Sequence, residues 1–565
     1  MTAINGVLWH NYVLFTVVVV GIVFTIWSGF CQFRSLTHGV AVVRGKYDDP
    51  NDPGAISHFQ ALSAALSATV GLGNIGGVAL AIALGGPGAV FWMWVIGLVG
   101  MAIKVTEVTL SMLYRNTDDD DNPHGGPMWV AAKGFARKNP SLAWLGRTIG
   151  IIFCITLLIS TITGGNMFQA WNVADITRTY FGVPGLITGL VLAIMVGLVI
   201  IGGIKRIGRV AGTLVPIMVA LYLIAGTYVL FLNADQIPGI FGMIFKSAFA
   251  PTEAAGAFLG GTMGFAILVG MKRALFSNEA GQGSSPIAHS AAKTDEPVRE
   301  GVVAGLEPFI DTIVVCTFTS LVILSTGVWN RAAEATYDTP PTVIPVELGQ
   351  WTIEEVPVPS RTKETWLDGA GVFMVYDGDA NPNTNNTRHR VDGQVVTENG
   401  RQLVRFADVY SETKPVLNDS GLYGNYVGAS LTARAFDSAF DGLGKWLVTI
   451  AAWLFALSTM ISWSYYGEQG MVFLAGEKSV LPYKFVYCLL IIVATAGFVR
   501  TDAQLDNLTG VGTGVMLFAN IPIIIIFGNQ AMKAYKNYMN RLKSGALSSG
   551  QPAPSLDQIL GDKTS

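Results

Sequence analysis

The chain has 565 residues and a net charge of −3, and 13% of its residues are charged. An ordinary soluble domain has about 25% charged residues, and here the charges collect between long stretches that carry almost none. These stretches repeatedly reach the length of about 20 apolar residues that one membrane-spanning helix needs. The composition therefore excludes an ordinary soluble protein, and the lack of a long basic block argues against a nucleic-acid partner.

Apolar stretches of this length predict an all-α membrane protein of about eleven transmembrane helices. The first stretch, near 12–33, is too long for the apolar part of a typical signal peptide, and no Lys or Arg precedes it. Residues 1–34 are therefore interpreted as an extra N-terminal helix that is retained. The other ten spans are expected near 60–84, 88–114, 148–174, 184–203, 208–232, 256–282, 303–328, 444–474, 483–500 and 508–530.

The positive charges predict the orientation of these spans. If the N-terminus is outside, loops that contain basic pairs and clusters, from Arg34 and Arg44 to Lys478 and Lys484, all fall on the inner side. The opposite loops near 85–88 and 175–183 contain a single basic residue. This pattern predicts a multi-pass protein of the cell (inner) membrane whose C-terminal tail, 533–565, is cytoplasmic.

The ten spans after the first divide into five plus five. An odd number of spans places the two sets in opposite orientations, which is the sequence pattern of an inverted repeat. The first repeat covers 58–235. The second covers 250–330 and 441–532, and a long polar insert at 331–440 interrupts it.

The insert is predicted to lie outside the membrane and to contain some β structure. Segments 372–376 and 394–397 are rich in β-branched and aromatic residues and are bounded by Asp, Asn and Gly. Two interpretations remain open: the insert is an external cap or lid, or it is an insertion without a transport role, which surface loops tolerate well.

The first helix of the first repeat is predicted to be broken. A glycine costs about 1 kcal/mol relative to alanine in a helix interior, and four glycines fall within seven residues: Gly71, Gly73, Gly76 and Gly77. An opened turn frees backbone amides that suit a carboxylate and carbonyls that suit Na⁺. Ser67, Thr69 and Asn74 add side-chain oxygens for a hard cation. The alternative is close helix packing through small residues.

The first helix of the second repeat, 260–283, is also interrupted by glycines, with a break expected near Gly270. It carries Lys272, Arg273 and Glu279, and such charges are costly at membrane depth. They act either as an anchor at the inner membrane surface or as an inner gate. In the gate interpretation, their ion-pair partners come from neighbouring spans: Glu107, Glu307 and Asp311.

Two segments, SATVGLGNIGG at 67–77 and FSNEAGQGSSPIAH at 276–289, resemble the alanine or glycine:cation symporter family. Segments 271–275 and 305–311 are also similar to it. The likeness covers roughly 1–330 and 441–535 and leaves out the insert. It implies the fold of the neurotransmitter:sodium symporters, within the amino acid–polyamine–cation superfamily. It also implies Na⁺-coupled symport of a small neutral amino acid, such as alanine or glycine, into the cell.

The resemblance also implies a Na⁺ site beside the first break. The backbone carbonyls of Ser67 and Val70, with Thr69 nearby, would face a hydroxyl of Ser458 or Thr459. Because these two residues are adjacent on a helix, we expect only one of them to point squarely inward, and neither is ranked above the other.

The substrate contacts implied by the resemblance lie on several helices. The carboxylate would sit at the amides of 71–77, and the ammonium at carbonyls freed near Gly270, next to Met271 and Phe276. Asn166 and Gln169, three residues apart and so on one helical face, would hold a polar group of the substrate. On another helix, Thr459 and Trp463 lie one turn apart, and Trp463 would form one wall of the pocket for the substrate's side chain. For each polar residue the alternative is a hydrogen bond between helices.

Other functions are distinguished by experiment. A proton-coupled symporter would use Glu279, Glu307 or Asp311 as the proton carrier, and a channel would line a continuous pore with the broken helices. A sensor that only binds a ligand through the insert is a further alternative. A membrane enzyme is disfavoured, because the six histidines are scattered along the chain. The preferred amino acid and the oligomeric state are left open.

Overall fold

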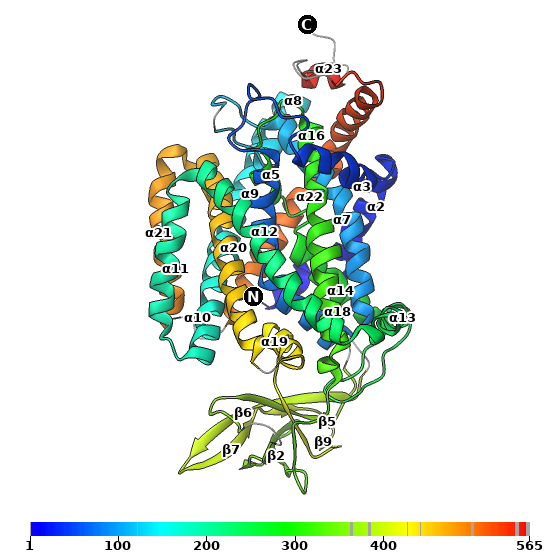
Figure 1. The fold of residues 1–565 in the computed structure, drawn as a ribbon, viewed down its shortest axis with the longest axis vertical. Helices are drawn as coiled ribbons and strands as arrows, with labels where there is room; N and C mark the ends of the chain where they lie inside the picture. The colour runs from blue at the N-terminus through cyan, green and yellow to red at the C-terminus, as the bar shows by residue number, and fades with distance from the viewer. Residues whose placement is uncertain are drawn as a thin grey trace.

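The computed structural model describes residues 2–120, 122–361, 365–381, 386–417, 419–426, 428–440, 442–498, 502–547 and 553–560. Figure 1 shows a bundle of long helices with a β-rich insert at one end, while α8 and α23 lie at the other. Within these residues, eight helices are long and apolar enough to cross a membrane, or nine if a bent pair counts as one span. The prediction of an all-α membrane protein with a β-containing insert is confirmed.

The first part of the chain forms these helices: α1 Thr2–Leu8, α2 Asn11–Trp27, α3 Cys31–Arg34, η1 Ser35–Gly39, α4 Val40–Val43, α5 His58–Thr69, η2 Gly73–Gly77, α6 Val78–Gly85, α7 Gly88–Tyr114, α8 Pro127–Lys138, η3 Pro140–Leu142, α9 Ala143–Ile162, η4 Thr163–Met167, α10 Phe168–Phe181, α11 Gly185–Ile200 and α12 Gly203–Leu232. Here η1, η2 and η4 are π-helical turns.

The helices of the second part are η5 Ala234–Gln236, α13 Ile237–Ala248, α14 Met263–Asn278, α15 Ser285–His289, α16 Pro297–Ala304, α17 Leu306–Pro308, η6 Phe309–Cys316, α18 Thr317–Ser325, η7 Val328–Asn330, α19 Ala429–Asp437, α20 Leu443–Ala475, η8 Glu477–Ser479, α21 Val480–Thr495, α22 Asp502–Lys543 and α23 Leu556–Leu560. The spans predicted near 184–203 and 256–282 correspond to α11 and α14, which have 16 residues each. The count of eleven spans stays a prediction.

The first broken helix is present. The capping box of Ser57 and Gln60 starts α5, and the helix ends at Thr69. The following half-helix, η2 with α6, is bent from it by 54°. The bend therefore lies just before Gly73, and Gly73–Gly77 form a π-helical turn rather than an open segment. Four glycines loosen the helix without opening every turn, because π geometry still pairs backbone groups within the segment.

The second break lies elsewhere than predicted. Helix α14 is continuous through Gly270 and ends at Asn278. The break follows at Glu279, Gly281 and Gly283, whose φ angles are +55°, +83° and +80°. At Gly270 a Cβ would come within 2.3 Å of the Ala89 carbonyl oxygen. This glycine therefore allows α14 to pack closely on α7 and does not interrupt the helix.

The insert contains two antiparallel sheets. The larger has the order β1-β10-β5-β6-β7-β4, with β9 paired to β5, and the smaller has the order β2-β3-β8. Their strands are β1 Ala335–Thr336, β2 Val343–Glu347, β3 Gln350–Ile353, β4 Val356–Pro357, β5 Gly371–Asp377, β6 Arg388–Glu398, β7 Arg401–Phe406, β8 Val409–Tyr410, β9 Val416–Leu417 and β10 Gly421–Gly424. Both predicted strand segments lie in β5 and β6, and the register pairs Gly371 with Gln394.

The chain returns from the insert to the bundle through α19. Thr432 on this helix donates a hydrogen bond from Oγ1 to the Ile75 carbonyl, at 3.1 Å. At Gly76 a Cβ would come within 3.0 Å of the Ala429 backbone nitrogen. The last helix of the insert region therefore packs directly on the π-helical turn of the first broken helix.

Candidate functional site

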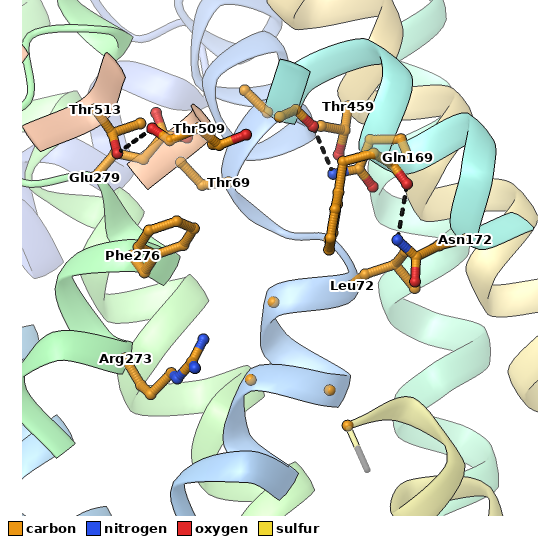
Figure 2. Close-up of a pocket in the computed structure, with 18 of the residues that line it drawn as sticks. Thr69, Leu72, Gln169, Asn172, Arg273, Phe276, Glu279, Thr459, Thr509 and Thr513 are labelled. Atoms are coloured by element: carbon orange, nitrogen blue, oxygen red, sulfur yellow. Dashed lines mark hydrogen bonds between the residues drawn. The ribbon is translucent and has the colours of Figure 1, made fainter. Parts of the chain in front are cut away.

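A cavity of about 420 Å³ lies at the bend of the first broken helix. Residues of η4, α10, α14, α20 and α22, and the start of α19, complete its wall. Figure 2 shows Arg273 and Phe276 on one side of the broken helix and Gln169 and Asn172 on the other. The predicted site residues that line the cavity are Thr69, Gly71, Gly73, Gly76, Gly77, Gln169, Arg273, Phe276, Glu279, Thr459 and Trp463.

Gln169 and Asn166 do not share a face, contrary to the helical-spacing prediction. Gln169 lines the cavity. Asn166 is buried elsewhere and donates from Nδ2 to the Tyr487 carbonyl at 2.7 Å. The reason is the π-helical turn η4, which contains Asn166 and shifts the helical phase before Gln169. Gln169 donates from Nε2 to the Gly164 carbonyl at 3.1 Å, and no described residue donates to its buried Oε1.

The oxygens of the predicted Na⁺ site meet at the end of α5. The Ser67 carbonyl oxygen lies 3.3 Å from both Ser458 Oγ and Thr459 Oγ1. The expectation that only one hydroxyl points inward is therefore wrong, because both reach the same carbonyl from adjacent positions of α20. Ser458 Oγ also lies 2.9 Å from the Phe455 carbonyl, which can take its proton and leave oxygen lone pairs for a cation.

Val70 and Thr69 complete this end of α5. Val70 is buried at the C-cap, and its N–H donates to the Leu66 carbonyl at 2.7 Å. The Thr69 hydroxyl donates within its own helix, to the Ala65 and Leu66 carbonyls. The last carbonyls of a helix have no intrahelical partner, so this terminus offers oxygen atoms beside the two hydroxyls of α20.

Asn74 stabilises the bend rather than lining the cavity. Its Oδ1 accepts a hydrogen bond from the Gly71 N–H at 2.8 Å. Its Nδ2 donates to Ser277 Oγ at 2.9 Å and to the Asp311 carboxylate. Asp311 also accepts from Ser277 Oγ at 2.7 Å and from Thr312 Oγ1 at 2.9 Å. Asn74 and Asp311 thus tie the first broken helix to α14 and η6.

The start of the half-helix η2–α6 faces the cavity. Its N-cap residue, Leu72, makes no side-chain cap hydrogen bond, and both Leu72 and Gly73 line the cavity. A helix N-terminus presents backbone amides and a partial positive charge, which suit an anionic group. Arg273 on the facing helix α14 adds a cationic side chain to the same cavity.

Aromatic rings form the apolar part of the wall. Phe168, Phe276 and Trp463 line the cavity. The Trp463 side chain fits there because Gly165 has none: a Cβ at that position would come within 2.5 Å of Trp463. Gly270 and Met271 do not line the cavity, since Gly270 packs on α7 and Met271 is buried in the core.

Three of the predicted gate residues, Glu107, Glu279 and Glu307, gather around a lysine that sequence reasoning missed, whereas Arg273 lines the cavity. Lys104 Nζ on α7 lies 3.4 Å from Glu307 Oε2 and 3.7 Å from Glu107 Oε1. Glu279 also interacts electrostatically with Lys104. Lys272, by contrast, lies over the Trp9 ring, 6.0 Å from its centroid. The charge interleaved with apolar residues in span 88–114 was a signal that could have identified Lys104.

Further residues of the cavity were also missed. Asn172 lies three residues after Gln169, on the same face of α10, so helical spacing could have found it. Thr509 and Thr513 lie one turn apart on α22, and Thr513 Oγ1 donates to the Thr509 carbonyl at 2.8 Å. Gln282 lies in the second break. These residues add polar groups from α10, α22 and the second broken helix.

Charged and aromatic side chains connect the insert to the wall of the cavity. Arg331 lies over the Tyr426 ring, 4.8 Å from its centroid, and pairs with Glu334 at 3.2 Å. Tyr426 Oη lies 2.8 Å from Arg361 and 3.2 Å from Glu334. Burial, with Glu334 close by, raises the pKa of Tyr426 above its ordinary value of 10.0. Gly428, two residues later, lines the cavity.

Comparisons with known proteins identify chains that are similar to this one over most of its length. The sodium/alanine symporter AgcS of Methanococcus maripaludis is 34% identical over 546 residues, which cover 97% of this chain and 98% of AgcS. The putative sodium/proton-dependent alanine carrier protein YrbD of Bacillus subtilis is 30% identical over 547 residues, which cover 96% of this chain and 93% of YrbD. The crystal structure of MhsT in complex with L-phenylalanine superposes with a TM-score of 0.46 at 13% identity, over 85% of this chain and 89% of MhsT.

The family match is continuous except within the insert. The sodium:alanine symporter family matches residues 1–358 and 409–551. The insert residues outside the match, 359–408, contain β5, β6 and β7. All the helices that line the cavity lie within the matched ranges. The chain therefore belongs to the sodium:alanine symporter family.

Proposed function

We propose that this protein imports a small neutral amino acid, such as alanine or glycine, together with Na⁺ by alternating access. Membership of the family makes it a cation-coupled amino acid transporter rather than an enzyme. The observation that carries the finer proposal is the cavity at the bend of the first broken helix, with the Ser67 carbonyl and two hydroxyls of α20 beside it.

Na⁺ binds at the end of α5 in this proposal. Hard cations prefer oxygen ligands, and the Ser67 carbonyl, Ser458 Oγ and Thr459 Oγ1 lie together there. The Val70 carbonyl is a further candidate at the same terminus. Binding of Na⁺ would join α5 to α20 and order the bend that forms the wall of the cavity.

The amino acid then occupies the cavity. Its carboxylate sits at the start of the half-helix, near Leu72 and Gly73, where amides and the helix dipole favour negative charge. Its ammonium donates to Gln169 Oε1, which receives no hydrogen bond from the described residues. Its side chain contacts Trp463 and Phe276. This assignment replaces the ammonium site near Gly270, since α14 is unbroken there.

Coupling between the two ligands is thermodynamic. Thr459 contributes to both sites, because its hydroxyl faces the Ser67 carbonyl and its side chain lines the cavity. Each ligand then raises the affinity of the other by the same factor. Movement of one helix bundle against the other opens the opposite side.

The test uses the full chain in liposomes with labelled alanine and glycine. Uptake should require an inward Na⁺ gradient, and equal uptake without the gradient would reject Na⁺ coupling. Uptake driven by a pH gradient without Na⁺ would replace the proposal with proton-coupled symport. Single-channel currents far above carrier rates would replace it with a channel. Competition by unlabelled small amino acids then identifies the preferred substrate.

A further inference from the structure

A buried row of ionisable side chains begins at the first residue of α5 and ends in the centre of the bundle. It consists of His58 on α5, Glu300 on α16, His289 on α15, Glu307 on α17 and Lys104 on α7, and each is at most 1% exposed. His58 and Glu300 are 242 residues apart in the chain. None of the five lines the transport cavity.

His289 has a carboxylate at each of its ring nitrogens. Its Nδ1 contacts Glu300 Oε1, and its Nε2 lies 2.7 Å from Glu307 Oε1. A neutral imidazole has only one N–H. If His289 were neutral, one ring nitrogen would direct its lone pair at a carboxylate oxygen. An imidazolium donates at both nitrogens and satisfies both contacts.

His58 shows the contrasting arrangement. Its Nδ1 contacts the other oxygen of Glu300, while its Nε2 is buried without a hydrogen-bond partner among the described residues. A neutral ring with its proton on Nδ1 accounts for this geometry. The row thus needs one proton beyond those of neutral imidazoles and ionised carboxylates, and that proton belongs on His289.

The surrounding charges favour this additional proton. Lys104 is the cation next to Glu307 and Glu107, and Glu279 interacts with both Lys104 and Glu307. From α20, Tyr466 interacts electrostatically with Glu107, Glu279 and Glu307. From the end of α7, the Arg115 guanidinium interacts with Glu300 and donates to the Ser290 and Ala292 carbonyls. Buried charges are stable only when they are paired, and a positive His289 reduces the excess of carboxylates.

The row also joins the two broken helices at one end. The backbone N–H of Ala55 donates to the Ala291 carbonyl at 2.8 Å, and that of Lys293 donates to the Ile56 carbonyl at 2.8 Å. The start of α5 is thus attached to the segment after α15. The His58–Glu300–His289 contacts begin next to this attachment, because His58 follows Ile56 by two residues. A movement of α5 away from this segment would break the His58–Glu300 contact.

We propose that His289, Glu300 and Glu307 form a proton-binding site, which holds a proton on His289 at neutral pH. The ligand is H⁺, and the site is separate from the Na⁺ site at the other end of α5. The bound proton itself can be measured without transport.

The direct test is solid-state ¹⁵N NMR of the full chain, labelled at histidine and reconstituted in lipid. The chain has six histidines, so a ring protonated at both nitrogens is resolvable. At pH 8 we expect one such ring in the wild type and its loss in His289→Gln. A wild-type spectrum with only neutral rings at pH 8 would overturn the proposal, as would a doubly protonated ring that persists in His289→Gln.

A matched control is His38→Gln. His38 is buried, but its Nε2 lies 2.8 Å from the neutral Tyr538 hydroxyl. Burial and nearby Arg299 lower the pKa of His38 to about 4, so its ring is neutral at pH 8 and its removal should leave the doubly protonated signal. Glu300→Gln keeps the shape of the site and removes one carboxylate, so the signal should disappear at a lower pH than in the wild type. An unchanged titration in Glu300→Gln would contradict the proposed site even if His289→Gln does not fold.

These experiments can reject the proposed transport function and the proposed proton site independently of each other. Na⁺-driven uptake with only neutral histidine rings would reject the proton site and leave the proposed function standing. A doubly protonated His289 in a protein without Na⁺-driven uptake would do the reverse.

Discussion

The two broken helices differ in the chemistry of their breaks. The first bends between Thr69 and Gly73, next to neutral carbonyl and hydroxyl oxygens and the cavity. The second breaks from Glu279 to Ser284 and leads into a buried group of carboxylates, a lysine and a histidine. In the proposed function the first break provides neutral ligands for the transported solutes, whereas the second connects to buried charges that contact several helices.

The strongest test of this comparison is Lys104→Met. The substitution keeps much of the side-chain volume but removes the buried ammonium that lies beside both Glu307 and Glu107, and loss of one partner of a buried pair costs about 3–5 kcal/mol. We expect a large fall in the unfolding temperature of the purified protein at pH 7. The control is Lys138→Met, at an exposed position of α8. Equal unfolding temperatures for the two variants would show that the second break does not depend on its charges.

Gln169→Ala tests the cavity at the first break, which is lined by neutral polar groups such as Gln169. A hydrogen bond to a charged group is worth about 1.5–3 kcal/mol, so alanine affinity should fall by roughly one to two orders of magnitude. Isothermal titration calorimetry in saturating Na⁺ measures the affinity for alanine. Asn166→Ala is the comparison, because Asn166 bonds to the Tyr487 carbonyl outside the cavity and its loss should affect stability more than affinity. Normal alanine affinity in Gln169→Ala would remove Gln169 from the substrate site.

Thr459→Val tests the proposed Na⁺ site. It removes one hydroxyl from the Ser67 carbonyl and keeps the shape of the side chain, while Ser458 remains in place. We expect the Na⁺ concentration for half-maximal uptake to rise about tenfold, which corresponds to about 1.4 kcal/mol. Ser464→Ala is the control on the same helix, since among the described residues that hydroxyl donates only to the Ile461 carbonyl of α20. If both variants keep the wild-type Na⁺ dependence, the hydroxyl of Thr459 is not a Na⁺ ligand.

The smallest effect is expected for Tyr426→Phe, at the connection to the insert. The ring stays over Arg331, and only the hydroxyl contacts with Arg361 and Glu334 are lost. A net loss of about 1 kcal/mol or less is expected. Because the pKa of Tyr426 is raised in the folded protein, its stabilising effect is fully present below pH 10 and is lost only above it. Thermal unfolding from pH 6 to 9 should therefore show a constant small difference, and a difference that varies within this range would contradict this assignment.

Local sequence patterns predicted much of the fold because they report local energetics. Apolar length predicted the membrane helices, and glycine density predicted the first broken helix. Short segments of β-branched and aromatic residues bounded by Asp, Asn and Gly predicted β5 and β6. The same reasoning placed the second break near Gly270, where the glycine instead permits close contact with Ala89 on α7. A glycine that breaks a helix and one that packs against a neighbour look the same in sequence.

Tertiary structure alone decided the rest of the site. The π-helical turn at Thr163–Met167 rotates Asn166 away from Gln169, and helical spacing cannot reveal such a turn. His58 and His289 are scattered in the sequence, yet both contact Glu300. The sequence by itself determined which segments enter the membrane, because apolar burial depends on local composition. Only the folded chain decided which buried charges meet, because that depends on how distant helices pack.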